Sequence, residues 1–234
     1  MSEILKIKDL WGGYAEGVDI LRGISLEVQQ GESVGIIGLN GSGKSTFGKA
    51  IMNMIPIRRG EILFEGKDIS ALSTNELSHR GISIMQQGGK VFPSLSVWEN
   101  LQLANHSKFS ILNSQLKEII PLLQCPKHML QHQMADKLSG GQKHQLSLAM
   151  TLATQPRLVI LDEPSAGLSP KAVEDMYRML CAVRESLGIT IILIEQNIAK
   201  AIEFCDRSII IKIGQICELN AHDKKNIESL IFKN

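Results

Sequence analysis

The stretch GLNGSGKST (38–46) combines the residue types and the spacing of a phosphate-binding loop. It fits the pattern G-x-x-x-x-G-K-[ST] and lies between an apolar run, SVGIIG (33–38), and a run with helical spacing, FGKAIMNMI (47–55). Glycines let backbone N–H groups approach phosphate oxygens, and the following helix adds the positive end of its dipole. The lysine supplies charge to the phosphates, and the next hydroxyl can bind Mg²⁺. The pattern predicts a nucleotide site formed by Gly38, Leu39, Asn40, Gly41, Ser42, Gly43, Lys44, Ser45 and Thr46.

Two carboxylates follow a second apolar run, RLVILDEP (157–164). Asp162 ends a predicted buried strand, where a free carboxylate is costly, and binding Mg²⁺ would offset that cost. Glu163 would point the other way if the strand geometry continued, and it could activate a water for attack on the γ-phosphate. The alternative is an acidic pair at a strand end that only caps the next loop.

A second candidate anion site is LSGGQ (138–142), which precedes the apolar, helix-like run KHQLSLAMTLA. Ser139 is expected to cap a helix that begins near Gly141, and the glycines open the backbone to an anion. A flexible helix cap without a ligand is the alternative. The candidate anion-binding residues are Ser139, Gly140, Gly141 and Gln142.

The composition is that of an ordinary globular domain. The 234 residues are 44% hydrophobic and 21% charged, and a net charge of +1 with 4% aromatics argues against nucleic-acid binding. The four cysteines form no C-x-x-C pair and are expected to be free thiols. The N-terminus does not resemble a signal peptide, and apolar runs such as TIILI (190–194) are far shorter than the ~20 residues of a membrane span.

The elements that must position these motifs alternate between strands and helices, which predicts an α/β fold with a mostly parallel core sheet. A long helical stretch, broken at Pro121 and Pro126, interrupts the alternation. Residues 3–37 are expected to form strands, among them 24–28. The other expected strands are 33–38, 58–69 with a turn at 65–67, 81–87, 157–163, 189–196 and a hairpin over 207–219 turning at Ile213 and Gly214. The expected helices are 47–55, 73–81, several within 95–152, 171–188 closing on Gly188, and 222–234.

The phosphate loop, LSGGQ and LVILDEP, in this order, resemble the motifs of ATP-binding cassette (ABC) ATPases, and the resemblance covers nearly the whole chain. It implies an α/β P-loop NTPase of ABC type, with a mostly parallel core sheet, an N-terminal antiparallel β subdomain and a helical insertion. The whole chain, 1–234, would be one domain. Its core and β subdomain would span about 1–94 and 153–234, and its helical subdomain about 95–152.

The resemblance also implies a reason for two anion sites. In that family two cassettes face each other head to tail, and the LSGGQ of one closes over the Mg·ATP held by the phosphate loop of the other. Residues 139–142 would therefore act on the ATP of the partner chain. A lone subunit is expected to hydrolyse ATP poorly.

Other family positions can be matched individually. Tyr14 stands where an aromatic ring stacks on adenine, although Trp11 is close enough to leave the choice open. Gln87 matches the glutamine that reaches Mg²⁺ and the attacking water, with Gln86 as the alternative by one residue. The metal ligands would then be Ser45, Gln87 and Asp162. SAGLSP (165–170) matches the loop that touches the opposite subunit.

Some positions depart from the family pattern. Gln196 stands where a switch histidine is usual, and glutamine donates a hydrogen bond but carries no proton or charge at neutral pH. We therefore expect Lys44, Glu163 and Gln196 to be the catalytic groups, with an altered timing of hydrolysis. Gln145 and Met150 replace common arginines.

IEQN and DEPSAGLSP resemble the ATPase subunits of branched-chain amino acid importers and of related urea and amide importers, although that branch commonly has Glu at the position of Gln87. This resemblance implies a cytoplasmic ATPase, peripheral on the inner face of the cell membrane. Its partners would be membrane permease subunits, a second cassette and an extracytoplasmic solute-binding protein. The alternatives are an exporter ATPase and a soluble ABC-type ATPase such as an iron–sulfur assembly factor.

VFPSLSVWENL (91–101) would be either core of the helical subdomain or a groove for a permease helix.

Overall fold

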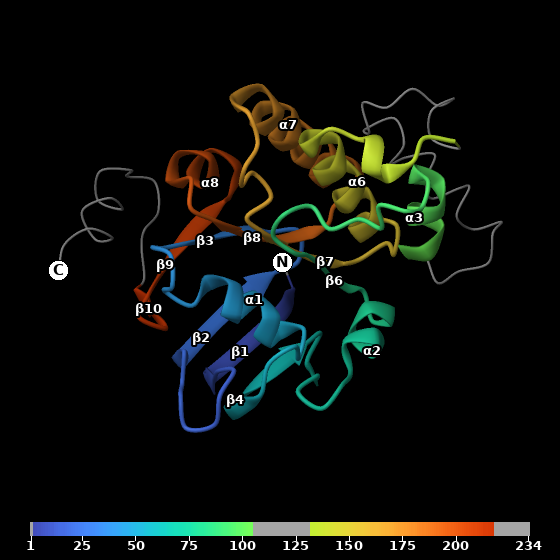
Figure 1. Cartoon of the computed structure of the whole chain (residues 1–234). Coiled ribbons are helices and arrows are strands. Elements are labelled where there is room, and N and C mark those ends of the chain that lie inside the picture. The colour runs from blue at the N-terminus through green and yellow to red at the C-terminus, as the bar shows by residue number, and fades with distance from the viewer. Residues whose placement is uncertain (1, 105–131, 218–234) are drawn as a thin grey trace.

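The computed structural model describes residues 2–104 and 132–217, which form two β-sheets flanked by helices (Figure 1). The larger sheet has six strands in the order β10-β9-β3-β8-β7-β6, and all neighbours except β10 and β9 run parallel. Its strands are β3 (Ser33–Ile37), β6 (Ile82–Met85), β7 (Leu158–Asp162), β8 (Thr190–Glu195), β9 (Arg207–Lys212) and β10 (Gln215–Cys217).

The three central strands of this sheet, β3, β7 and β8, are buried at every residue. Such continuous apolar runs are typical of a parallel sheet that is covered on both faces. The carboxyl ends of parallel strands meet at the same edge of a sheet. The segments that follow β3, β6, β7 and β8 therefore come together there, and each of them carries a predicted site residue.

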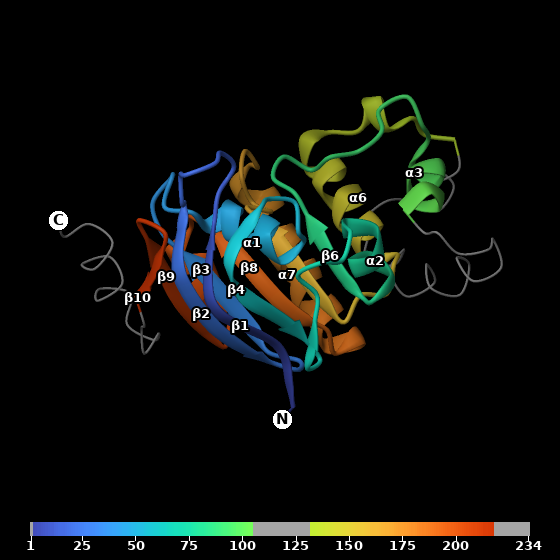
Figure 2. The same cartoon turned by 90° about the horizontal axis from the view of Figure 1, so that it is seen from below.

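The smaller sheet is antiparallel, in the order β2-β1-β4-β5. This confirms the antiparallel β-sheet expected beside the parallel core. The first helix, α1, lies between the two sheets, and its Phe47 and Ile51 are fully buried in a core shared with strands of both (Figure 2). The elements are β1 (Glu3–Gly12), β2 (Leu21–Gln29), β4 (Ile57–Phe64), β5 (Lys67–Asp68) and α1 (Lys44–Ile51).

The other face of the six-stranded sheet is covered by helices, of which α6 and α7 are the longest described (Figure 1). A second apolar core joins α3, α6 and α7 to this face. Helix α7 ends as expected, since Gly188 adopts a left-handed conformation with φ 60° as its C-cap. The helices are α2 (Thr74–His79), α3 (Val97–Ala104), α6 (Gly140–Leu152), α7 (Pro170–Leu187), α8 (Ile198–Phe204) and a 3₁₀ turn, η2 (Ala135–Lys137).

Two expectations about the chain path need correction. The helix expected over 47–55 ends at Ile51, because Asn53 takes a left-handed conformation (φ 51°) and its side-chain amide donates to the carbonyls of Ile69 and Leu72. The stretch 95–152 is not helical throughout, since residues 132–139 form a loop and a 3₁₀ turn. The hairpin that turns at Ile213 and Gly214 is confirmed.

The breaks expected at Pro121 and Pro126 lie outside the described residues, as does the helix expected over 222–234.

Candidate functional site

The segment between β3 and α1 has the backbone that close contact with an anion requires. Gly41 and Gly43 adopt positive φ angles of 77° and 107°, and Gly43 begins α1 without a side-chain cap. A Cβ atom at Gly38 would lie 2.3 Å from the carbonyl oxygen of Ile211, so only glycine fits there. The helix therefore starts with backbone N–H groups that no capping side chain uses.

Within this loop, Lys44 and Ser42 have side chains directed at a site rather than at solvent. The Lys44 ammonium donates to the carbonyls of Gly38 and Leu39 at 2.9 and 3.0 Å. Burial lowers the pKa of Lys44, and the charges of Glu163 and Asp162 oppose that shift. The buried Ser42 hydroxyl has no hydrogen-bond partner among the described residues. Both groups can donate to phosphate oxygens.

Ser45 and Asp162 meet across the interface between α1 and β7. The Ser45 hydroxyl donates to Oδ1 of Asp162 at 2.9 Å, and Asp162 is only 3% exposed. Burial raises the pKa of the Asp162 carboxyl, and the hydrogen bond from Ser45 opposes that shift. A hydroxyl and a buried carboxylate are oxygen ligands of the kind Mg²⁺ prefers, and a cation would relieve the cost of the buried charge. These residues therefore fit a magnesium ion.

Glu163 does not continue the strand, so the condition under which strand geometry would point it away from Asp162 is not met. Strand β7 ends at Asp162, and Glu163 has a left-handed conformation with φ 49°. Its buried carboxylate is held between two side-chain amides. Nε2 of Gln87 donates to Oε2 at 2.7 Å, and Nε2 of Gln196 donates to Oε1 at 2.6 Å.

This arrangement separates the two adjacent glutamines after β6. Gln87 contacts Glu163, whereas Gln86 lines a cleft of about 280 Å³ between α2, β6 and α6. Gln196 follows β8 directly and is exposed apart from its contact with Glu163. The residues that follow three parallel strands thus meet at one carboxylate, as the topology requires.

LSGGQ forms a capped helix start at the surface. Ser139 caps α6 by accepting from the backbone N–H of Gln142, and the Gln142 side chain accepts from the backbone N–H of Ser139. The helix starts at Gly140, one residue earlier than expected. Ser139 and Gly140 are exposed, and a Cβ atom at Gly140 would have no neighbour within 4 Å among the described residues, apart from those next to it in the chain and the backbone of its own helix. The positive end of the α6 dipole and the exposed backbone at Gly140 therefore face outward, where a second molecule can approach.

The aromatic residues near the phosphate loop occupy different environments. Tyr14 is 53% exposed, and the Lys49 ammonium of α1 lies 5.4 Å from its ring centroid. Trp11 belongs to β1, and its indole N–H donates to Oδ1 of Asp9 at 2.7 Å. The guanidinium of Arg59 lies 5.9 Å from the Trp11 ring. Tyr14 therefore has the freer ring face beside the helix that begins at the phosphate loop.

The stretch 91–101 mixes buried and exposed apolar residues. Val97 and Leu101 belong to the core around α6, whereas Phe92 is 49% exposed. Asn100 fixes the turn that presents Phe92, because its side chain accepts from the Phe92 N–H at 2.7 Å and donates to the Phe92 carbonyl at 3.0 Å. The stretch is thus both part of a core and a source of exposed apolar surface.

The sequence analysis did not identify two buried polar residues beside the site. His144 of α6 lies 2.8 Å from the carbonyl oxygen of Pro164, which links LSGGQ's helix to the segment after Glu163. Glu195, the last residue of β8, is 2% exposed. The sequence contains a pattern that could have identified Glu195. The apolar run IILI is followed by this carboxylate, just as the run LVIL is followed by Asp162.

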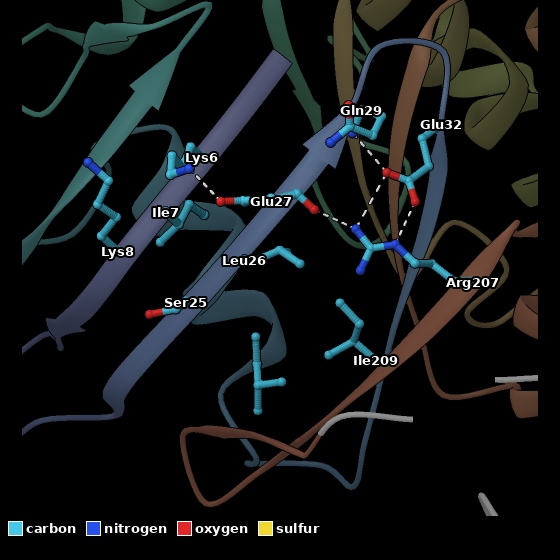
Figure 3. A pocket seen from close by; sticks show the side chains of 11 residues that line it. Lys6, Ile7, Lys8, Ser25, Leu26, Glu27, Gln29, Glu32, Arg207 and Ile209 are labelled. Carbon is cyan, nitrogen blue, oxygen red and sulfur yellow. Dashed lines mark hydrogen bonds and ion pairs between the residues drawn. The ribbon is translucent and has the colours of Figure 1, made fainter. Parts of the chain in front are cut away.

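A cleft of about 870 Å³ opens elsewhere, between β1 and β2 on one side and β9 and β10 on the other (Figure 3). Its cations are paired with carboxylates, since Lys6 contacts Glu27 and Nε of Arg207 lies 2.5 Å from Oε1 of Glu32. Because Glu32 precedes β3 and Arg207 begins β9, this part of the cleft lies toward the amino ends of these strands, whereas the phosphate loop follows the carboxyl end of β3. We assign it no ligand.

Two further observations concern only residues 2–104 and 132–217. None of their helices has the length and apolar character needed to cross a membrane. They contain no cluster of three His, Cys, Asp or Glu side chains able to hold a metal ion. Magnesium commonly uses only one or two protein ligands together with phosphate oxygens, so the Ser45 and Asp162 pair does not require such a cluster.

Comparison with known proteins relates this site to a family. Residues 21–166, more than half of the chain, match the family described as ABC transporter. The chain is 30% identical to the high-affinity branched-chain amino acid transport ATP-binding protein BraG of Pseudomonas aeruginosa, over 87% of each chain. It is 31% identical to the lipopolysaccharide export system ATP-binding protein LptB of Escherichia coli, over 91% of this chain and 88% of that protein.

A crystal structure of a nucleotide-free ATP-binding cassette from an ABC transporter has the same fold. It superposes with a TM-score of 0.85 at 26% identity, covering 98% of this chain and 95% of that chain.

Proposed function

The chain belongs to the ABC transporter family, whose cassettes hydrolyse ATP to power transport, and from this premise we propose that it serves a membrane importer. The transported solutes are branched-chain amino acids or related small polar molecules such as urea or amides. The importer reading is supported by the identity to BraG together with IEQN at 194–197 and DEPSAGLSP at 162–170.

Each site residue has a separate role in ATP hydrolysis. Lys44 and the loop N–H groups hold the phosphates, while Ser45, Asp162 and Gln87 hold Mg²⁺, which neutralises charge on the phosphate oxygens. Glu163 accepts the proton of the attacking water, because each carboxylate oxygen retains a lone pair beyond its bond to an amide. Gln196 orients this carboxylate and contacts the γ-phosphate. The observation that carries this assignment is the double amide contact to Glu163.

Two cassettes complete each other's sites. The exposed start of α6 brings Ser139, Gly140 and Gln142 to the ATP of the partner cassette, and the loop 165–170 reaches the same interface. The partner is a second copy or a homologous chain. Of the described residues, 95–104 and 132–152 belong to the proposed helical subdomain (about 95–152), and 2–94 and 153–217 belong to the proposed core (about 1–94 and 153–234).

A permease subunit docks on the cytoplasmic side of the membrane, at the cleft between α2, β6 and α6. Lys90 and Met150 line this cleft, and the exposed Phe92 lies two residues beyond Lys90 in the chain. Most side chains that line this cleft are Ser, Thr, Gln or Lys, its apolar members are Met52, Ile82, Ile84 and Met150, and Phe92 adds exposed apolar surface outside the lining. An extracytoplasmic solute-binding protein delivers the solute to that permease.

The test is a mild-detergent purification of the tagged native chain, followed by mass spectrometry of its partners. We expect a polytopic permease and a second cassette, and loss of the permease from a Phe92→Asp variant that still binds ATP. Ile213→Asp is the matched control, because Ile213 is 65% exposed in the β9–β10 turn, where aspartate tolerates the positive φ. Recovery of soluble partners alone, under several detergents, would contradict the proposal.

An exporter ATPase is the second candidate, because LptB is as similar to this chain as BraG is. The same purification separates the two. An importer permease co-purifies with a solute-binding protein gene product or binds one in vitro, whereas an exporter permease does not.

A further inference from the structure

Glu195 is a buried carboxylate for which the catalytic scheme above has no use. It ends β8, a strand in which every residue is buried, and it directly precedes Gln196. Its exposure is 2%, and no salt bridge neutralises it among the described residues. A buried charge of this kind persists only when hydrogen bonds satisfy it, so its partners indicate what it holds in place.

The two oxygens of Glu195 hold two different segments. Oε1 accepts from the hydroxyl of Ser165 at 2.6 Å and from its backbone N–H at 3.3 Å. Oε2 accepts from the backbone N–H groups of Gln196 at 3.1 Å and of Asn197 at 3.3 Å. One side of the carboxylate therefore fixes the start of the loop 165–170, and the other side fixes the turn that carries Gln196.

The surroundings keep this carboxylate in place. Tyr177 of α7 packs edge-on against Phe204 of α8, with ring centroids 5.8 Å apart. Burial, and then the negative charge of Glu195, raises the pKa of the Tyr177 phenol, which therefore stays neutral. Strand β8 also holds the catalytic segment, because the backbone N–H of Glu163 donates to the carbonyl of Ile194 at 2.9 Å. A displacement of Ser165 must therefore move the Gln196 turn or break bonds to a charged acceptor, which are the stronger class of hydrogen bond.

We propose that Glu195 is a positioning residue that couples the loop 165–170 to Gln196, so that engagement of a partner cassette by the loop sets the side chain facing the γ-phosphate. The inference rests on the proposed roles of that loop and of Gln196. In this proposal, the buried carboxylate of Glu195 links the loop that contacts the partner cassette to the residue beside the hydrolytic site. A purely local role in capping the turn after β8 would leave Ser165 without influence on Gln196.

Amide hydrogen exchange of the full-length chain tests the link without hydrolysis. Ser165→Ala removes one partner of Oε1 and touches neither Gln196 nor Asn197. We expect the amides of residues 196 and 197 to exchange about tenfold faster in this variant, as expected for a weakened charged hydrogen-bond network. Thr151→Ala, which removes a hydroxyl that donates to the carbonyl of Ser147 in α6 and makes no bond to Glu195, is the control and should leave that exchange unchanged. Unchanged exchange at 196 and 197 in Ser165→Ala would overturn the proposal.

A double-mutant cycle adds the functional readout. Ser165→Ala and Glu195→Gln should each lower kcat about tenfold with unchanged ATP affinity, since glutamine can satisfy only one of the two segments. Because both changes cut the same link, the double variant should be no slower than the slower single variant. Multiplicative effects, or wild-type kcat in both singles, would contradict the coupling. A wild-type chain without ATPase activity would instead refute the catalytic assignment, and the exchange experiment would still decide the link.

Discussion

The amide nitrogen of Gln196 donates to Oε1 of Glu163 at 2.6 Å, which joins the residue after β8 to the residue after β7. Gln196 stands at the position where the family resemblance places a switch histidine, a group able to change its charge. An amide cannot do so, and it donates to the carboxylate at every physiological pH. The contact between Gln196 and the proposed catalytic carboxylate of Glu163 is therefore independent of any protonation of Gln196.

This contact predicts how variants of Gln196 behave. Gln196→Ala should lower kcat roughly tenfold to a hundredfold with little change in ATP affinity, because it removes a hydrogen bond to a charged group. Gln196→His should remain active and gain a pH dependence near about 6.5, where an imidazole titrates. Steady-state rates of the three proteins over pH 6–8 provide the measurement. Parallel pH profiles for wild type and Gln196→His would contradict the assigned contact.

Asp162 should lower the stability of the ligand-free protein at neutral pH. Burial raises its pKa above the ordinary 3.8, so the favourable contribution of the protonated form is present at low pH and is lost as pH rises through the folded-state pKa. Asp162→Asn keeps an oxygen for the Ser45 hydroxyl without the buried charge. We expect its melting temperature to exceed that of wild type by ~2–4 °C at pH 7, with a smaller difference near pH 4.

Addition of Mg·ATP should reverse that order, because only wild type retains the full metal site. Thermal melts with and without nucleotide at both pH values make the comparison. A less stable ligand-free Asp162→Asn at neutral pH would show that the carboxylate is structural.

Tyr14 rather than Trp11 should contact the base. Tyr14→Ala removes an exposed ring face and is expected to weaken ATP binding about tenfold, the order of a single base-stacking contact. Trp11→Phe removes the indole bond to Asp9 and keeps an aromatic ring, so it should bind ATP as wild type does. Fluorescent-nucleotide titration of both variants decides between the two rings. The opposite ranking would assign stacking to Trp11.

Complementation between variants tests the shared sites. Lys44→Ala disables the phosphate loop of its own chain, and Gly140→Asp places a negative charge at an exposed helix start, where an added Cβ atom has open space among the described residues. Each variant alone should be inactive. Random pairing makes about half of the dimers mixed, and each mixed dimer has one intact site of its two, so an equal mixture should recover about a quarter of wild-type activity. A mixture as inactive as its components would contradict a site built from two copies.

Much of this site could be predicted from the sequence because its residues follow buried strands. SVGII, LVILD and TIILIE are continuous apolar runs, and parallel pairing brings the residues after them to one edge of the sheet. The geometry of Glu163 could not be predicted, because nothing in DEP indicates that the residue takes a left-handed conformation. The choice between Gln86 and Gln87 also required the structure, since a shift of one residue at a strand end changes the direction of the side chain.

The contacts of Glu195 could not be predicted from the sequence for a different reason. The reasoning that identified Asp162, a carboxylate at the end of a buried strand, applies equally to Glu195, yet its side-chain partner, Ser165, lies thirty residues earlier. Long-range partners of this kind depend on the order of β7 and β8 in the sheet. The shorter course of α1 likewise depends on Asn53, whose amide reaches carbonyls of residues 69 and 72.

The most direct test of the catalytic assignment is the ATPase activity of Glu163→Gln measured together with its ATP affinity. We predict a loss of turnover of about a hundredfold or more, the usual contribution of a positioned general base, with ATP affinity retained. Glu185→Gln on the exposed face of α7 is the matched control and should behave as wild type. Turnover at the wild-type rate in Glu163→Gln would contradict the role of this carboxylate in activating water.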